Sequence, residues 1–153
     1  MSIEYRTLNY ADTNEMRRYL VLFYGIPAVL DEFYRPKSAE FIEASIVAAR
    51  EQEVPTNTFS GIAVEHGEVV GLHILRRFEE SGLVGAHIAG LWVDERRRGI
   101  GVARTLKEHG EAWARSIGAG FLNTNVQADN VRMLEINERY GFKPYRINLR
   151  KRL

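Results

Sequence analysis

The chain has 153 residues, of which 45% are hydrophobic and 27% charged, and its formal net charge is +1. A chain of this length and composition buries about two thirds of the surface that it exposes when unfolded, so we expect a single globular domain over residues 1–153. The balanced charge excludes the broad basic surface on which non-specific nucleic-acid binding relies, so any anionic partner must be recognised locally.

The sequence contains no cysteine, which excludes disulfides, thiolate metal ligands and a cysteine nucleophile. Its opening, MSIEYRTLNYAD, lacks the basic start and apolar core of a signal peptide. The most apolar run, YLVLFYGIPAVL, is too short and too interrupted by Gly and Pro to cross a bilayer. We therefore expect a cytoplasmic protein with no metal, no membrane role and no nucleic-acid partner.

The first third of the chain is predicted to hold one strand and two helices. Residues 3–10 alternate between polar and apolar like a strand, and residues 11–24 place apolar side chains at helical spacing. A second helix is predicted over residues 38–52, with Ser38 as its N-cap. The loop between the helices, residues 25–36, begins with Gly-Ile-Pro, which stops the first helix.

A hairpin and a third strand come next. His66 and Gly67 divide residues 58–75 into two runs rich in Val and Ile, which predicts a two-residue turn between antiparallel strands. A second turn at residues 79–82 leads into residues 86–93, a strand that is apolar on both faces and is therefore expected inside the sheet.

The last third is predicted to read helix, strand, helix, strand. Residues 102–117 carry an apolar stripe, and residues 121–127 form the following strand. A strand, helix and strand in succession imply a right-handed crossover, so residues 86–93 and 121–127 should pair in parallel. Residues 130–142 form the last helix, and residues 143–153 alternate like a basic edge strand.

The run VDERRRGIGVARTL places three arginines and two glycines between a strand and a helix. The N-terminus of a helix presents unpaired N–H groups and the positive end of its dipole, and glycines allow an anion to come close. The run lacks the Gly-Lys-Ser/Thr of a Walker loop, and it lacks the third small residue of a dinucleotide fingerprint. The sequence therefore predicts a phosphate-binding turn of another kind.

Two motifs resemble signatures of the GNAT superfamily, whose members are N-acyltransferases that use acyl-CoA. VDERRRGIGVARTL resembles the pyrophosphate-binding signature R-x-x-G-x-G/A, and NVRMLEINERYGF is similar to a second signature of an Asn, a helix and a closing Gly-Phe. The order of strands and helices around the two motifs also fits the family fold. The matching positions are Arg96, Gly99 and Gly101 in the first motif and Asn130, Gly141 and Phe142 in the second.

The resemblance implies a mixed α/β (α+β) fold, with about four helices and a mostly antiparallel sheet of six to seven strands that contains one parallel pair. It implies that acetyl-CoA binds where those two strands splay apart, with Gly90 marking the bulge that separates them. Neighbouring loop charges are usually solvated, so one or two of the three arginines are expected to reach the ligand. The cofactor-binding residues implied are Leu91, Trp92, Val93, Arg96, Arg97, Arg98, Gly99, Ile100, Gly101, Val102, Ala103, Asn130 and Asn137.

Acyl transfer to an amine needs a base for the nitrogen and a donor for the acyl oxygen. His87 lies at about the place where some relatives have a carboxylate base, with a structural histidine as an equal alternative; His73 is a second candidate. A strand N–H near residues 91–93 is the expected donor. Many relatives carry a tyrosine acid at the position of Asn137, the third candidate catalytic residue, which can donate a hydrogen bond but not a proton. The usual acid is therefore either missing here or replaced by Tyr140, one turn on.

Asp31, Glu32 and Tyr34 lie in the loop where relatives build the acceptor pocket, and they would hold a cationic amine by charge and stacking; a solvated loop is the alternative. We therefore expect an N-acetyltransferase that moves the acetyl group to an amine of a small molecule or peptide by direct attack in a ternary complex. The alternatives are a non-catalytic CoA-binding module, or an acyltransferase with another donor or a hydroxyl acceptor. A homodimer also remains open, because edge strands are exposed.

Overall fold

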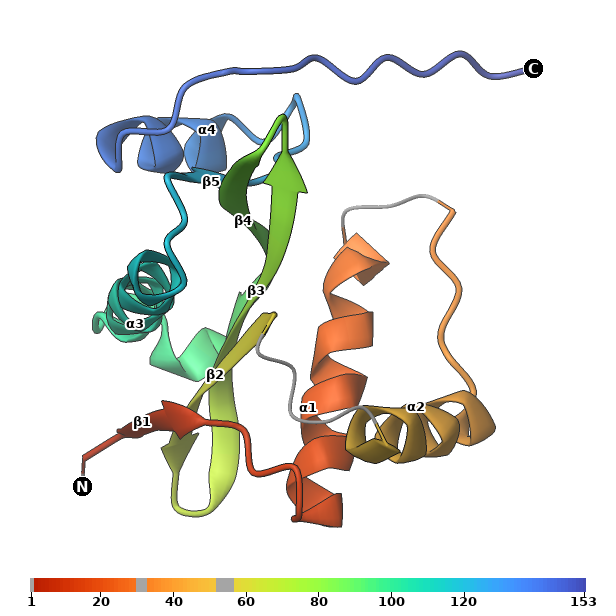
Figure 1. Cartoon of the computed structure of the whole chain (residues 1–153). Coiled ribbons are helices and arrows are strands. Elements are labelled where there is room, and N and C mark those ends of the chain that lie inside the picture. The colour runs from red at the N-terminus through yellow and green to blue at the C-terminus, as the bar shows by residue number, and fades with distance from the viewer. Residues whose placement is uncertain (1, 30–32, 52–56) are drawn as a thin grey trace.

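The computed structural model describes residues 2–29, 33–51 and 57–153. Five strands in this part of the chain form one sheet in the order β1-β2-β3-β4-β5, antiparallel except for the β4–β5 pair. Helices α1 and α2 cover one face of the sheet and α3 covers the other (Figure 1). The elements are β1 (Glu4–Thr7), α1 (Thr13–Gly25), the 3-10 turn η1 (Ile26–Val29), α2 (Ala39–Glu51), β2 (Thr58–Glu65), β3 (Glu68–Glu80), β4 (Leu83–Val93), the 3-10 turn η2 (Glu95–Arg97), α3 (Val102–Ser116), β5 (Phe121–Asn123) and α4 (Val131–Arg139).

The mixed fold with one parallel pair is confirmed, but the prediction of six to seven strands is wrong for the described residues, which form five. Residues 143–153 are an exposed tail without regular structure that passes over the end of the β3–β4 hairpin, where Arg146 pairs with Glu80, towards the side of α1 (Figure 1). The edge strand predicted here from alternating polar and apolar residues does not form. Ile147 and Leu149 pack on no sheet and are more than 80% exposed. The strand predicted over residues 121–127 ends at Asn123, since the chain turns towards α4.

Two tight turns set the register of the long antiparallel strands. Glu65 pairs with Glu68 across the predicted turn at residues 66–67, and residues 81–82 join β3 to β4 in the same way. The four turn residues have φ between 52° and 79°, the left-handed conformation of turns whose twist matches that of a hairpin. Both predicted hairpins are therefore confirmed.

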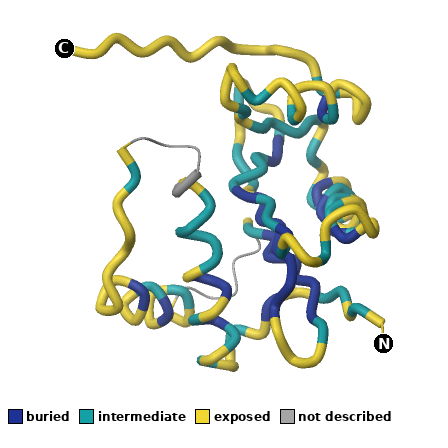
Figure 2. The backbone as a smooth tube through the Cα atoms, turned by 180° about the vertical axis from the view of Figure 1, so that it is seen from behind, coloured by how far each residue is buried: buried dark blue, intermediate teal, exposed yellow. Residues whose placement is uncertain are grey.

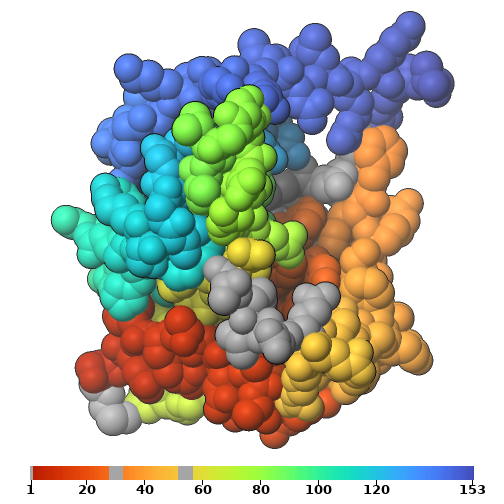
Figure 3. All heavy atoms as spheres, viewed as in Figure 1, coloured from red at the N-terminus to blue at the C-terminus, as the bar shows by residue number. Residues whose placement is uncertain are grey.

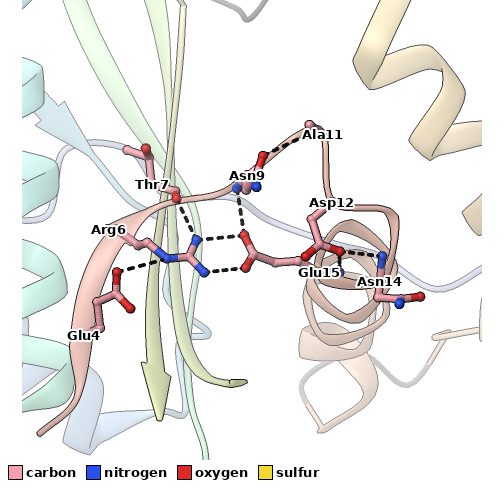
Figure 4. A network of polar contacts seen from close by, with 8 residues as sticks. All are labelled: Glu4, Arg6, Thr7, Asn9, Ala11, Asp12, Asn14 and Glu15. Carbon is pink, nitrogen blue, oxygen red and sulfur yellow. Dashed lines mark hydrogen bonds and ion pairs between the residues drawn. The ribbon is translucent and has the colours of Figure 1, made fainter. Parts of the chain in front are cut away.

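Charged hydrogen bonds connect the start of α1 to β1 (Figure 4). Arg6 donates from Nη1 and Nη2 to the two carboxylate oxygens of Glu15, at 2.9 and 2.5 Å, and the N–H of Asn9 donates to Glu15 at 2.7 Å. The hydrogen bond from Arg6 is the main cause that lowers the pKa of Glu15. Asp12 caps the helix by accepting from the N–H groups of Asn14 and Glu15. The predicted cap of α2 is also present, as Ser38 accepts from the third N–H beyond it.

The buried residues concentrate on the central strands and on the helix faces turned towards them (Figure 2). The face under α1 and α2 forms the largest cluster, and α3 covers a second and a third cluster on the opposite face. The side chains that the helices contribute are Met16, Tyr19, Leu20, Ile42 and Ile46 on the first face and Val102, Leu106 and Ala114 on the second.

Two glycines allow α3 to lie close to β3. A Cβ at Gly110 in α3 would lie 2.8 Å from side-chain atoms of His73 and Leu75. A Cβ at Gly71 in β3 would lie 3.1 Å from Leu106 of α3. Because atoms this close must move apart, the glycines determine how near the helix comes to the sheet and thus where its N-terminus lies.

We expect Gly110→Ala to lower the free energy of unfolding by about 1–3 kcal/mol, because the added methyl group overpacks the contact between α3 and β3. Urea denaturation followed by circular dichroism measures this change. Gly25→Ala is the matched control, since a Cβ there meets nothing within 4 Å and alanine favours a helix. Equal stabilities of the two variants would contradict the close packing.

Candidate functional site

The fourth strand carries a bulge where the sequence predicted one. Ile74 and Leu75 are adjacent in β3 but pair with Gly90 and Ile88, so Ala89 is an extra residue in β4. A bulge bends its strand and increases the local twist. The direction of β4 therefore changes just before its last three residues.

The two parallel strands share only a short ladder before they separate. Residues 85–87 of β4 pair with β5, which ends at Asn123. Residues 88–93 continue along β3 on one edge, and no described strand pairs with their other edge. Backbone groups on such an edge can pair with an extended ligand. Leu91, Trp92 and Val93 lie here, and because the Trp92 side chain packs against the core under α1, its contribution to a ligand would come from the backbone.

The loop between β4 and α3 presents a row of unpaired backbone N–H groups. Gly99 and Gly101 have φ of 80° and 94°, and a Cβ at either would project into open space. The N–H groups of residues 99–104 make no hydrogen bond to another described residue, and Gly101 caps α3 without a side-chain hydrogen bond. Unpaired N–H groups at the positive end of a helix dipole are the kind of place where proteins bind phosphate groups.

The first arginine of the loop is paired with a carboxylate. Arg96 donates from Nε and Nη2 to Asp94 at 3.1 and 2.9 Å, and its backbone N–H donates to the same carboxylate at 2.9 Å. The side-chain hydrogen bonds from Arg96 are the main cause that lowers the pKa of Asp94 to about 2. The pair therefore stays ionised at neutral pH, while the Arg96 side chain remains 81% exposed.

The other two arginines differ in direction. Arg97 donates from Nε to Glu65 at 2.5 Å, which turns its side chain back to the end of β2. Arg98 donates from Nε to the carbonyl oxygen of Val93 at 3.1 Å, and its side chain is 59% exposed. Arg97 thus attaches the loop to the sheet, whereas Arg98 lies at the surface, with its Nη1 3.8 Å from Glu95.

His87 lies where β4 and β5 begin to separate. It pairs with Arg76 of β3 on one side and with Asn123 of β5 on the other. Its neighbour Ala86 packs beneath α3, and successive side chains alternate in a strand, so His87 faces the side of α1. Partial burial, and less strongly the charge of Arg76, lower the pKa of His87. The imidazole is therefore neutral at neutral pH and can accept a proton.

Helix α4 and its ends hold the three other predicted site residues. Asn130 caps α4 by accepting at Oδ1 from the N–H of Met133, at 3.2 Å. Asn137 is 8% exposed, and its side chain forms no hydrogen bond to another described residue. Tyr140 is half exposed, with Nζ of Lys107 4.5 Å from its ring centroid. It lines a cavity of about 640 Å³ between α3, β5 and the start of the tail.

Two of the predicted acceptor-loop residues, Asp31 and Glu32, lie outside the described residues. Tyr34 is half-buried. Phe33 lies beneath the guanidinium groups of Arg150 and Arg152, which are 5.7 and 5.6 Å from its ring centroid. The tail therefore extends over this loop (Figure 3). Sequence reasoning missed this contact because neither the loop nor the tail has a sequence pattern that predicts which segment it packs against.

Sequence reasoning also missed Arg76 and Lys107, two cations beside the candidate catalytic residues. Arg76 is adjacent to His87 across the β3–β4 ladder, and the hairpin register at residues 79–82 was the signal that would have paired them. Lys107 is half-buried between α3 and Tyr140, and burial lowers its pKa. Its place outside the apolar stripe predicted for this helix gave no such signal.

Neither a metal cluster nor a membrane-spanning helix occurs in the described residues. No three His, Cys, Asp or Glu side chains in this part of the chain are grouped so that they could hold a metal ion. The longest described helix, α3, has 15 residues, whereas a helix needs about 20 apolar residues to cross a bilayer.

Solved structures of acetyltransferases share this fold. A putative acetyltransferase from Pyrococcus furiosus superposes with a TM-score of 0.74 at 20% identity, over 99% of this chain and 100% of that one. Glucosamine-6-phosphate N-acetyltransferase from Arabidopsis thaliana gives 0.70 at 16% identity, over 99% of each chain. An aminoglycoside acetyltransferase from an uncultured soil metagenomic sample, meta-AAC0020 in complex with sisomicin, gives 0.72 at 14% identity, over 99% of this chain and 96% of that one.

A family model describes the larger part of the sequence. It is the model of the acetyltransferase (GNAT) family, and it matches residues 23–142. No curated protein was found to be similar in sequence. The matched region contains the β4 bulge, the loop at residues 94–101 and the helix capped by Asn130. On this match and this geometry, the chain belongs to the GNAT acetyltransferase family.

Proposed function

We propose that the protein is an N-acetyltransferase that transfers the acetyl group of acetyl-CoA to an amine, with both substrates bound at once. One observation carries the proposal: the unpaired N–H groups of residues 99–104 directly follow the free edge at residues 88–93. The first feature suits a pyrophosphate and the second suits an extended, amide-containing arm. Coenzyme A joins these two chemical parts in one molecule.

The residues around this junction fit such a ligand. The N–H groups of residues 99–104, with the exposed side chains of Arg96 and Arg98, would hold the pyrophosphate. The backbone of residues 91–93 would pair with the pantetheine arm, and the amide nitrogen of Asn130, which takes no part in the helix cap, would face it from α4. When bound, acetyl-CoA supplies an acetyl group activated as a thioester.

The proton transfers are proposed for His87, where β4 and β5 separate, and for Tyr140, at the end of α4. His87 is neutral at neutral pH and would accept the proton of the attacking amine, which must be uncharged to react. A backbone N–H of β4 near Leu91 would donate to the acyl oxygen. Tyr140 would supply a proton to the leaving sulfur, because the amide of Asn137 donates hydrogen bonds but carries no acidic proton.

The acceptor is proposed to be an amine on a polar scaffold. Two similar structures carry names that refer to amino sugars, glucosamine-6-phosphate and aminoglycosides, and these suggest the class of compound to assay first. Asp31 and Glu32 would attract the cationic form of such an amine, and Tyr34 would pack against its scaffold. The loop connects α1 to α2, and these helices cover the face of the sheet that His87 faces.

We expect acetyl-CoA to raise the thermal stability of the wild type and not of Gly101→Glu. A ligand at about 100 times its Kd stabilises the native state by about 2.7 kcal/mol, whereas a carboxylate at position 101 would occupy the anion surface. Gly82→Glu is the control, because Gly82 has φ of 78° and open space like Gly101 but lies in the turn at the opposite end of β4. Differential scanning fluorimetry measures all three proteins.

Stabilisation of the Gly101→Glu variant equal to that of the wild type would place the pyrophosphate elsewhere. No stabilisation of either the wild type or Gly82→Glu would overturn the acetyl-CoA proposal. Stabilisation without turnover of any amine or hydroxyl acceptor would favour a binding module over an enzyme.

We expect His87→Ala to lower kcat at least about tenfold at neutral pH. In the wild type, activity should decrease as the pH is lowered and His87 becomes protonated. Because Arg76 lowers the pKa of His87, Arg76→Gln should move this acidic limb of the pH–rate profile to higher pH. Arg77→Gln is the control, since Arg77 is paired with Glu79. An acidic limb that persists unchanged in His87→Ala would exclude His87 as the base.

A further inference from the structure

His73 is a buried polar side chain between β3 and α3. It is 1% exposed, so the prediction that it is a second candidate base has no support in the structure. Its Nδ1 lies 3.1 Å from the carbonyl oxygen of Gly90 in the β4 bulge. On its other side, the place that a Cβ of Gly110 would occupy is 2.8 Å from His73 Cδ2 and 3.0 Å from Nε2. One ring thus contacts both the bulge and the helix.

The hydrogen bond has a defined direction and tautomer. A carbonyl oxygen only accepts, so Nδ1 must carry the proton and donate it to Gly90. Burial, the largest influence, lowers the pKa of His73 to about 4 although the hydrogen bond to Gly90 acts in the opposite direction. The neutral ring with a proton on Nδ1 is therefore the form present at neutral pH.

This donor matters because a bulge interrupts the ladder that would otherwise satisfy backbone groups. Gly90 is itself buried, and a buried carbonyl without a partner costs about 1–3 kcal/mol. The hydrogen bond from His73 satisfies the carbonyl oxygen of Gly90 and so favours one conformation of the bulged backbone. That conformation sets the direction of residues 91–93, which immediately follow.

We propose that His73 is a positioning residue that keeps the free edge of β4 and the N-terminus of α3 in a fixed relation, so that both can hold one cofactor. Its hydrogen bond to Gly90 positions the edge, and the same side chain lies against Gly110 of α3, the helix that begins after Gly101. This inference rests on the proposed acetyl-CoA site.

Three variants separate positioning from mere burial. His73→Asn places an amide N–H close to where Nδ1 donates, whereas His73→Leu has similar bulk and no donor. Both replace the ring that contacts Gly110, so a difference between the two variants reports the hydrogen bond to Gly90. Ser60→Ala is the control, because Ser60 is also a buried polar group of the sheet, 5% exposed and hydrogen-bonded to Tyr19 at 3.0 Å, but it faces the α1 side.

We expect His73→Leu to raise the Kd of acetyl-CoA about tenfold or more, measured by isothermal titration calorimetry at a temperature where every variant is folded. The Asn variant should stay within about threefold of the wild type, and so should Ser60→Ala even if it unfolds more easily. Equal losses in the Leu and Asn variants, or no loss in either, would overturn the inference.

The ligand-free proteins give a test that does not depend on acetyl-CoA. In NMR spectra we expect His73→Leu, and not His73→Asn, to shift the backbone amide resonances of Leu91 and Gly101 together. The nitrogen shifts of the wild-type ring should report a proton on Nδ1. Shifts confined to β3 would overturn the coupling even if acetyl-CoA binds, whereas a wild type that fails to bind acetyl-CoA would overturn the proposed function alone.

Discussion

Strand β4 remains paired with β3 along its whole length but loses its other neighbour after His87, and the site depends on this one-sided pairing. A strand in the interior of a sheet has no backbone groups to offer a ligand, and an edge strand offers them along its full length. In β4, residues 88–93 have one backbone edge that no described strand pairs with, and this edge lies just before the loop that leads to α3. The bulge at Ala89 adds a bend at the same place, so the free edge and the change in direction coincide.

The rest of the architecture supports that arrangement from both faces. On one face, α1 and α2 pack against β2, β3 and β4, and the Arg6–Glu15 pair fixes where α1 starts. On the other face, Gly71 and Gly110 bring α3 close to β3. The loop from Asp94 to Gly101 is thus held between a strand and a helix whose positions are set by packing.

Much of this could be predicted from sequence, because the signals were local. The turn at residues 66–67, the positive φ of Gly99 and Gly101 and the bulge beside Gly90 all follow from neighbouring residues. The strand prediction for residues 143–153 was wrong because alternation shows which face a strand would bury and not whether a neighbouring strand exists. Arg97 pairs with Glu65, and His73 with Gly90. Both contacts depend on strand register and on the face that each side chain takes, so only the structure reveals them.

The three arginines of the loop are each within reach of a carboxylate, in the pairs Arg96–Asp94, Arg97–Glu65 and Arg98–Glu95. The segment that appears most basic in the sequence is therefore close to electrically balanced in the folded protein. Such a surface exerts little long-range attraction on the phosphate compounds that are abundant in any cell. The local charge balance of the loop therefore depends on these three pairs, which the order of residues along the chain does not reveal.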